Sequence, residues 1–69
     1  LEQGLNAYRK GDYVAALKLW QPLAAKGNPD AQNNLGVLYE KGQGVERNFV
    51  ESVNWYRRAA DQGHAQAQN

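Results

Sequence analysis

The sequence predicts an all-α fold of the alpha-alpha superhelix (solenoid) type, in which antiparallel helix pairs stack to form about two repeats. The 69 residues include no isoleucine or threonine and five valines, whereas alanine, leucine, glutamine, lysine and glutamate supply much of the rest, a composition that favours helix over strand. Apolar residues recur at helical spacing in segments that each end at a glycine. The apolar pattern of the first half also returns 36 residues later. A repeating, all-helical chain is typical of a solenoid.

The glycines and the apolar spacing predict four helices, over residues 2–10, 13–26, 29–41 and 49–62, and a fifth beginning near His64. Glycine tolerates the left-handed backbone that ends a helix, and a cation just before the first three of these glycines favours the negative end of the helix dipole. The predicted stops are Gly11, Gly27, Gly42 and Gly63.

Short polar side chains mark the starts of the second, third and fourth helices. Asp12 precedes the second helix, and Asn28, followed by Pro29, precedes the third. Asn48 with Glu51 three residues later resembles a capping box. These side chains can accept hydrogen bonds from the free backbone N–H groups of a first turn, so each helix start is predicted independently of the apolar pattern.

Pro22 lies inside the predicted second helix. It removes the hydrogen bond to the carbonyl of Lys18 and crowds that turn, so we expect a bend between these two residues.

Residues of matching size and polarity recur in register at a shift of 36, and the longer loop after Gly42 absorbs the difference in repeat length. We therefore expect Trp20 and Tyr56 to occupy matching surroundings. Gly36 has no side chain and is expected to let the fourth helix approach the third closely. The main pairs are Tyr13 and Phe49, Val14 and Val50, Leu17 and Val53, Trp20 and Tyr56, and Ala24 and Ala60.

The runs AQNNLGVLYEKGQGV at 31–45 and NWYRRAADQG at 54–63 together resemble one complete Sel-one-like repeat, a relative of the tetratricopeptide repeats. The resemblance implies three segments: a tetratricopeptide-like first helix pair at 1–30, one full Sel-one-like repeat at 31–66, and the start of a further helix at 67–69.

The resemblance also implies a protein–protein interaction scaffold or adaptor, whose first helix in each pair lines a concave face that binds a peptide or a partner protein. Asparagine side chains on that face can hold a ligand backbone through both donor and acceptor. Plain solvent exposure is the other interpretation of the same residues. The candidates for the groove are Glu2, Asn6 and Arg9 on the first helix and Asn33, Val37 and Glu40 on the third.

A second functional hypothesis is a homotypic stacking or assembly element with no separate ligand. Each helix pair leaves apolar surface uncovered unless another pair stacks on it, so we expect the C-terminal end to be open. Either more repeats follow Asn69 or the chain self-associates through that end. The residues report no compartment; by family analogy alone, the expected location is exported or periplasmic in bacteria.

Composition and motifs argue against a catalytic, metal, nucleotide or nucleic-acid site in this chain. The chain has no cysteine and a net charge of +1, so neither a thiolate site nor a nucleic-acid partner is expected, and no apolar run is long enough for membrane insertion. Gly42, Gln43 and Gly44 lack the third glycine of a nucleotide-binding loop. Ser52 and His64 lack a third catalytic partner. We expect no enzyme activity, no cofactor and no metal.

Aromatic and basic residues adjoin at Trp55, Tyr56, Arg57 and Arg58, as they do in some nucleic-acid surfaces. Helical spacing instead predicts Tyr56 in the core and the arginines in solvent. Trp55 lies at the margin of the apolar stripe, which leaves open whether it packs against a neighbouring repeat or against a partner.

Overall fold

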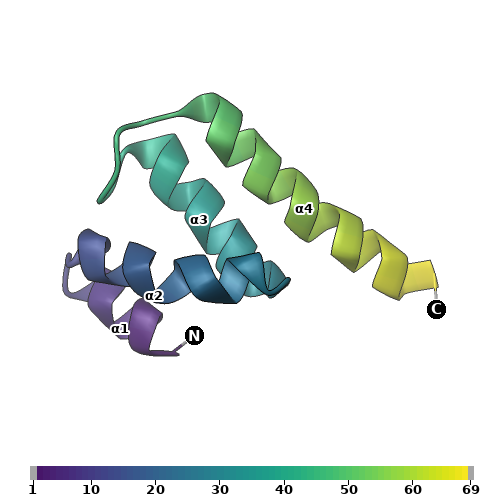
Figure 1. The fold of residues 1–69 in the computed structure, drawn as a ribbon, viewed down its shortest axis with the longest axis horizontal. Helices are drawn as coiled ribbons and strands as arrows, with labels where there is room; N and C mark the ends of the chain where they lie inside the picture. Colours follow the sequence, from purple (N-terminus) through teal and green to yellow (C-terminus); the bar gives the residue numbers. More distant parts are fainter. Residues whose placement is uncertain (1, 69) are drawn as a thin grey trace.

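The computed structural model describes the backbone of residues 2–68 and the side chains of residues 2–62. All the regular secondary structure of the described residues is helical, with no strand, as the composition predicts. Figure 1 shows the order of the helices along the chain. They are α1 (Glu2–Arg9), α2 (Tyr13–Ala25), α3 (Pro29–Lys41) and α4 (Phe49–Gln68).

Each helix packs on its neighbour in the chain: α1 on α2, α2 on α3, and α3 on α4 (Figure 1). Helices α3 and α4 run side by side in opposite directions. Helices α1 and α3, the first members of the two pairs, do not pack directly on each other. This is the arrangement of a small helical solenoid and confirms the predicted fold class.

Side-chain caps begin α2, α3 and α4 at the predicted residues. In each case an aspartate or asparagine oxygen accepts a hydrogen bond from a backbone N–H three residues later, which satisfies one of the free donors of the first turn. The three bonds run from Ala15 N to Asp12 Oδ1 (3.2 Å), from Ala31 N to Asn28 Oδ1 (3.1 Å) and from Glu51 N to Asn48 Oδ1 (3.1 Å).

Three of the four predicted glycine stops are confirmed, and the fourth is wrong. Gly11, Gly27 and Gly42 end or follow α1, α2 and α3 with φ angles of 82°, 100° and 69°, a left-handed conformation that costs glycine little. Helix α4 instead continues through Gly63 to Gln68, so the helix predicted to end at residue 62 is longer and no separate helix begins near His64.

The reason for this error is that glycine permits a helix stop without enforcing one. After Gly27 the chain reverses because α3 packs back on α2. No described helix packs in the same way on the far side of α4, and the alanine and glutamine residues that follow Gly63 favour helix. Residue 69, the last of the predicted third segment, lies outside the described residues.

Helix α2 continues through Pro22 without a break, and its last carbonyls keep their partners: Lys26 N donates to Pro22 O at 3.1 Å. The bend expected between Lys18 and Pro22 stays a prediction.

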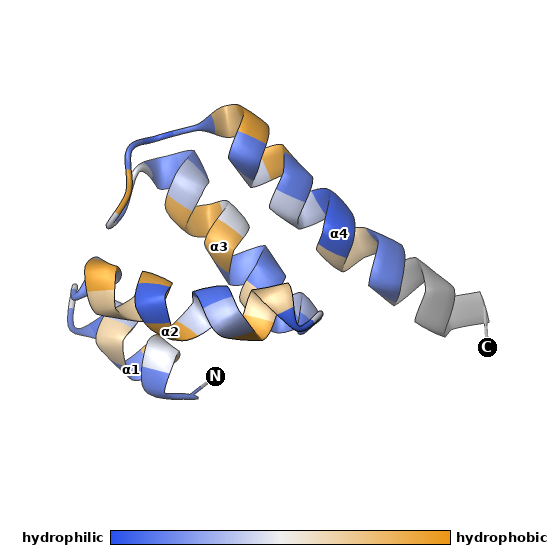
Figure 2. Ribbon diagram, in the orientation of Figure 1, coloured by the Kyte–Doolittle hydropathy of each residue, from blue (hydrophilic) through white to orange (hydrophobic). Residues whose placement is uncertain are grey.

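The core lies between α2 and α3. In Figure 2 hydrophobic residues gather where these two helices face each other, and others lie near the start of α4. The largest fully buried side chain is Trp20, which is 2% exposed, and Trp55 packs against the edge of the same core. The buried apolar residues are Ala16, Leu17, Trp20 and Ala24 of α2 and Ala31, Leu35 and Leu38 of α3.

An aromatic ring packs over a glycine in each helix pair. A Cβ atom on Gly36 would lie 2.8 Å from ring atoms of Tyr56, and one on Gly4 would lie 2.1 Å from Nε1 of Trp20. Gly36 therefore allows the close approach of α4, as predicted. The contact at Gly4 is its counterpart in the first pair. The surroundings of the two rings nevertheless differ, and the expectation that Tyr56 lies in the core is wrong: Trp20 is 2% exposed and belongs to the core, whereas Tyr56 is half-buried and outside it.

Candidate protein-binding groove

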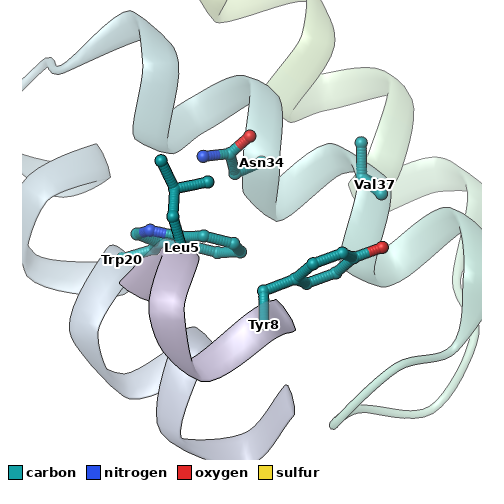
Figure 3. A pocket seen from close by; sticks show the side chains of 5 residues that line it. All are labelled: Leu5, Tyr8, Trp20, Asn34 and Val37. Atoms are coloured by element: carbon teal, nitrogen blue, oxygen red, sulfur yellow. The ribbon is translucent and has the colours of Figure 1, made fainter. Parts of the chain in front are cut away.

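A pocket of about 200 Å³ opens along the seam between α1 and α3. Figure 3 shows the ring of Trp20 near Leu5 and Asn34, with Tyr8 and Val37 toward the other end. Leu5 and Tyr8 belong to α1, Trp20 to α2, and Asn34 and Val37 to α3. The pocket thus lies between the first helices of the two pairs, which were expected to line a concave face.

The pocket arises because α1 and α3 both pack on α2 but not on each other. Leu5 and Tyr8 lie three residues apart and project from one face of α1, as Asn34 and Val37 do from α3. Between these two faces lies the ring of Trp20, which is 2% exposed, and Gly4 allows the ring to extend beneath α1. The seam therefore stays open above an aromatic floor.

The loop after α3 holds the wall formed by Tyr8. The Tyr8 hydroxyl donates a hydrogen bond to Oε1 of Gln43 at 3.0 Å, and the Tyr8 ring lies 5.1 Å from the Tyr13 ring and 5.9 Å from the Trp20 ring. Gly44 has a φ angle of 76°, and a Cβ atom there would lie 2.7 Å from the backbone of Tyr13. The longer loop of this repeat therefore packs on the start of α2 and orients Tyr8.

The lining is suited to an uncharged, largely apolar group. Four of the five lining side chains are aromatic or aliphatic, and the fifth, Asn34, offers both a donor and an acceptor. The indole N–H of Trp20 is buried against α1 without a hydrogen-bond partner, so the ring contributes mainly its apolar surface. A large apolar side chain with a peptide backbone beside Asn34 matches this arrangement in chemistry and in size.

Of the three groove candidates on α3, Val37 lines the pocket and is half-buried. Asn33 and Glu40 are exposed and lie four residues before and three residues after Val37, so they border it on the same face of the helix. Glu40 also accepts a hydrogen bond from the Tyr56 hydroxyl at 2.8 Å. Burial, and then this hydrogen bond, raise the pKa of Tyr56 to about 12.

The three candidates on α1 are exposed and none lines the pocket. Glu2 and Arg9 lie three residues before and four residues after Leu5, so they border its side chain along the helix. Asn6 is the next residue after Leu5 and therefore points about a quarter-turn away from it. Of the six candidates, Val37 thus lines the pocket, Asn6 lies beside it, and the other four border it.

Four pocket residues were not among the candidates. Leu5, Tyr8 and Trp20 have the spacing and character of core residues: Trp20 belongs to the buried cluster, and Leu5 and Tyr8 pack against it. The partial exposure of Leu5 and Tyr8 follows from the seam between α1 and α3, which no periodicity reveals. Of these four residues, only Asn34 could have been predicted from the sequence, because it lies three residues before the candidate Val37 and therefore shares its helix face.

Trp55 packs inside the repeat. Its ring packs against the core, and the guanidinium carbon of Arg58 lies 4.8 Å from the ring centroid, a cation–π contact. Among the residues described, no group of three His, Cys, Asp or Glu side chains could hold a metal ion. None of the described helices has both the length and the apolar character needed to cross a membrane.

Comparison with protein families supports two successive repeats. The family model for the Sel1 repeat matches residues 1–28 and again residues 29–64. The two matches meet at the turn between α2 and α3, so each one covers a helix pair.

Three curated relatives are similar over most of the chain. "DAP3-binding cell death enhancer 1" of Rattus norvegicus is 40% identical over 57 residues, which is 83% of this chain and 11% of that protein. An uncharacterized protein of Neisseria meningitidis serogroup B is 39% identical over 81% of this chain and 12% of its own length. "ERAD-associated E3 ubiquitin-protein ligase component HRD3A" of Arabidopsis thaliana is 36% identical over 84% of this chain and 9% of its own length. The chain thus spans about a tenth of the length of these relatives. No solved structure matches it significantly.

Proposed function

Because the chain belongs to the Sel1 repeat family, we propose that it is a protein-binding scaffold or adaptor segment that holds a peptide or partner protein in the groove between α1 and α3. Sel1 repeats are generally protein–protein interaction modules and typically non-catalytic. Two relatives are named for association with other proteins, one as DAP3-binding and one as a component of a ubiquitin ligase.

The observation that carries this proposal is the pocket lined by Leu5, Tyr8, Trp20, Asn34 and Val37. It takes an apolar anchor side chain from an extended peptide, and the Asn34 amide pairs with the peptide backbone next to that anchor. Burying one aliphatic or aromatic side chain contributes roughly 1.5 to 3 kcal/mol, enough to raise affinity by about tenfold or more. The charged residues Glu2, Arg9 and Glu40 at the border would then select among ligands by charge.

The test uses peptides selected from a random display library on the immobilised chain. Binding is followed by the emission of Trp20 in a Trp55→Phe variant, because Trp20 is then the one tryptophan and forms the floor of the pocket. We expect Val37→Glu to weaken binding by about tenfold or more, since it places a charge in the apolar wall. Val50→Glu, at a 70% exposed valine of α4, is the matched control and should leave the affinity unchanged.

If Val37→Glu and Val50→Glu weaken peptide binding equally, or if neither weakens it, the selected peptides bind elsewhere. Asn33→Ala at the border and Asn6→Ala beside it are tested in the same assay. If these amides hold the peptide backbone, each substitution lowers affinity while the far-ultraviolet circular dichroism stays the same.

A further inference from the structure

The loop after α3 places the side chain of Gln43 beside α1. Gly42 and Gly44, on either side of it, have left-handed φ angles of 69° and 76°, which glycine adopts at little cost. The N–H of Gln43 donates to the carbonyl of Leu38 at 2.9 Å, and Gly44 lies against the backbone of Tyr13. Gln43 is half-buried and is therefore held between the end of α3 and the start of α2.

This position allows Gln43 to take the single proton of the Tyr8 hydroxyl. The hydroxyl donates to Oε1 of Gln43 at 3.0 Å, across 35 positions of sequence, while the rings of Tyr13 and Trp20 pack against the Tyr8 ring. A tyrosine hydroxyl has one O–H, and its oxygen can also accept a hydrogen bond. Because the proton points to Gln43, the oxygen remains as an acceptor. Figure 3 shows this oxygen at the same end of the pocket as Val37.

The size and the lining of the pocket favour an aromatic occupant. A cavity of roughly 150 Å³ holds a benzene molecule, so the pocket of about 200 Å³ can admit the larger ring system of indole. The rings of Tyr8 and Trp20 line it, and aromatic rings attract one another beyond the effect of the area that they bury. An indole has one N–H donor and no acceptor, so it complements a site whose end offers an acceptor.

We propose that Gln43 makes the pocket selective for tryptophan as the anchor side chain of the bound peptide. The inference rests on the proposed peptide-binding function and adds the identity of the anchor. The indole N–H donates to the Tyr8 oxygen, and the peptide backbone next to the anchor pairs with the Asn34 amide. Phenylalanine or leucine would fill the pocket without a donor for that oxygen. Gln43 acts through Tyr8 and is therefore a positioning residue.

The test measures the binding of two small probes to the 69-residue chain. N-acetyl-L-tryptophan amide carries the indole N–H. The corresponding amide of 3-benzothienylalanine has a ring of nearly the same shape, with sulfur in place of that N–H. Binding is followed through the NMR signals of the methyl groups of Leu5 and Val37, two residues that line the pocket. We expect the tryptophan amide to bind roughly fivefold more tightly, the effect of one uncharged hydrogen bond.

Substitutions assign this preference to Tyr8 and Gln43. Tyr8→Phe removes the acceptor and should abolish the preference. Gln43→Leu leaves the hydroxyl free to turn its proton into the pocket and should reduce the preference, whereas Gln43→Glu still accepts that proton and should retain it. Gln3→Leu, at an exposed amide of α1, is the control and should change nothing. The preference is a ratio of two affinities within one variant, so a general loss of stability does not produce it or remove it.

The contrary results separate this inference from the function on which it rests. If the parent chain binds both amides equally, the selectivity for tryptophan is wrong, while the groove between α1 and α3 remains a binding site. If neither amide shifts the Leu5 and Val37 signals, the inference falls together with the anchor pocket of the proposed function. If Gln43→Leu shows the same preference as the parent chain, Gln43 does not select the anchor.

Discussion

The contact between Gly4 and Trp20 makes a specific prediction about stability. An alanine in the interior of a helix normally stabilises a protein by about 0.5 to 1 kcal/mol relative to glycine. At Gly4, however, the added Cβ would lie 2.1 Å from Nε1 and 2.7 Å from Cδ1 of Trp20. Trp20 is 2% exposed, so the ring cannot move away and α1 must shift instead. Overpacking of this kind costs roughly 1 to 3 kcal/mol.

Because 2.1 Å is far inside ordinary contact, we place Gly4→Ala at or above the upper end of that cost and expect a net loss of about 2 kcal/mol. For a chain of this size the loss corresponds to a fall in Tm of about 10 °C, measured by circular dichroism. Asn6→Ala, on the exposed side of the same helix, is the control and should raise the Tm slightly.

A double-mutant cycle isolates the cause. In a Trp20→Leu background the ring is absent, so Gly4→Ala should become neutral or stabilising. Gly36→Ala should cost less than Gly4→Ala, because the nearest atoms of the half-buried Tyr56 are 2.8 Å away and its ring can shift toward solvent. A Gly4→Ala variant that is as stable as the parent chain would refute the close approach of α1 to the Trp20 ring.

Three further predictions concern polar groups. Ser52→Ala removes the bond of 2.8 Å from a buried hydroxyl to the carbonyl of Gly36 and should lower the free energy of unfolding by about 1 kcal/mol in urea titrations. Gln32→Leu removes both the donor to the Ala24 carbonyl and the acceptor of the Gln62 amide, and should cost about 1 kcal/mol or more. The raised pKa of Tyr56 predicts a pH effect: its neutral form is favoured in the folded chain, so its contribution to stability is complete below pH 10 and lost between pH 10 and about 12. A Tyr56→Phe variant should lack this loss.

Each of these three has a clear contrary result. If Ser52→Ala or Gln32→Leu leaves the unfolding midpoint in urea unchanged, the corresponding hydrogen bond does not hold the helices together. If the parent chain and Tyr56→Phe lose stability in parallel between pH 10 and about 12, the Tyr56 hydroxyl is not held in its neutral form by burial and by Glu40.

Local features of the sequence were sufficient to predict where the helices begin. Asp12, Asn28 and Asn48 act within one turn of their own helices, so their role depends on no distant residue. The fold class followed from composition and from the repeat for the same reason, since neighbouring repeats contact only each other. The helix end at Gly63 depended on packing from outside α4, and there the local signal was misleading.

The amino-acid sequence by itself determined the helical character, the capped starts and the template shared by α2 and α4, because each arises from interactions within one helix or from direct comparison of residues. Only the tertiary structure decided that Leu5, Tyr8, Trp20, Asn34 and Val37 surround one pocket. That pocket depends on α1 and α3 both packing on α2 but not directly on each other, and on a ring passing beneath Gly4. Helical periodicity specifies which side of a helix is apolar, but the distance between two such sides is set by the side chains of a third helix.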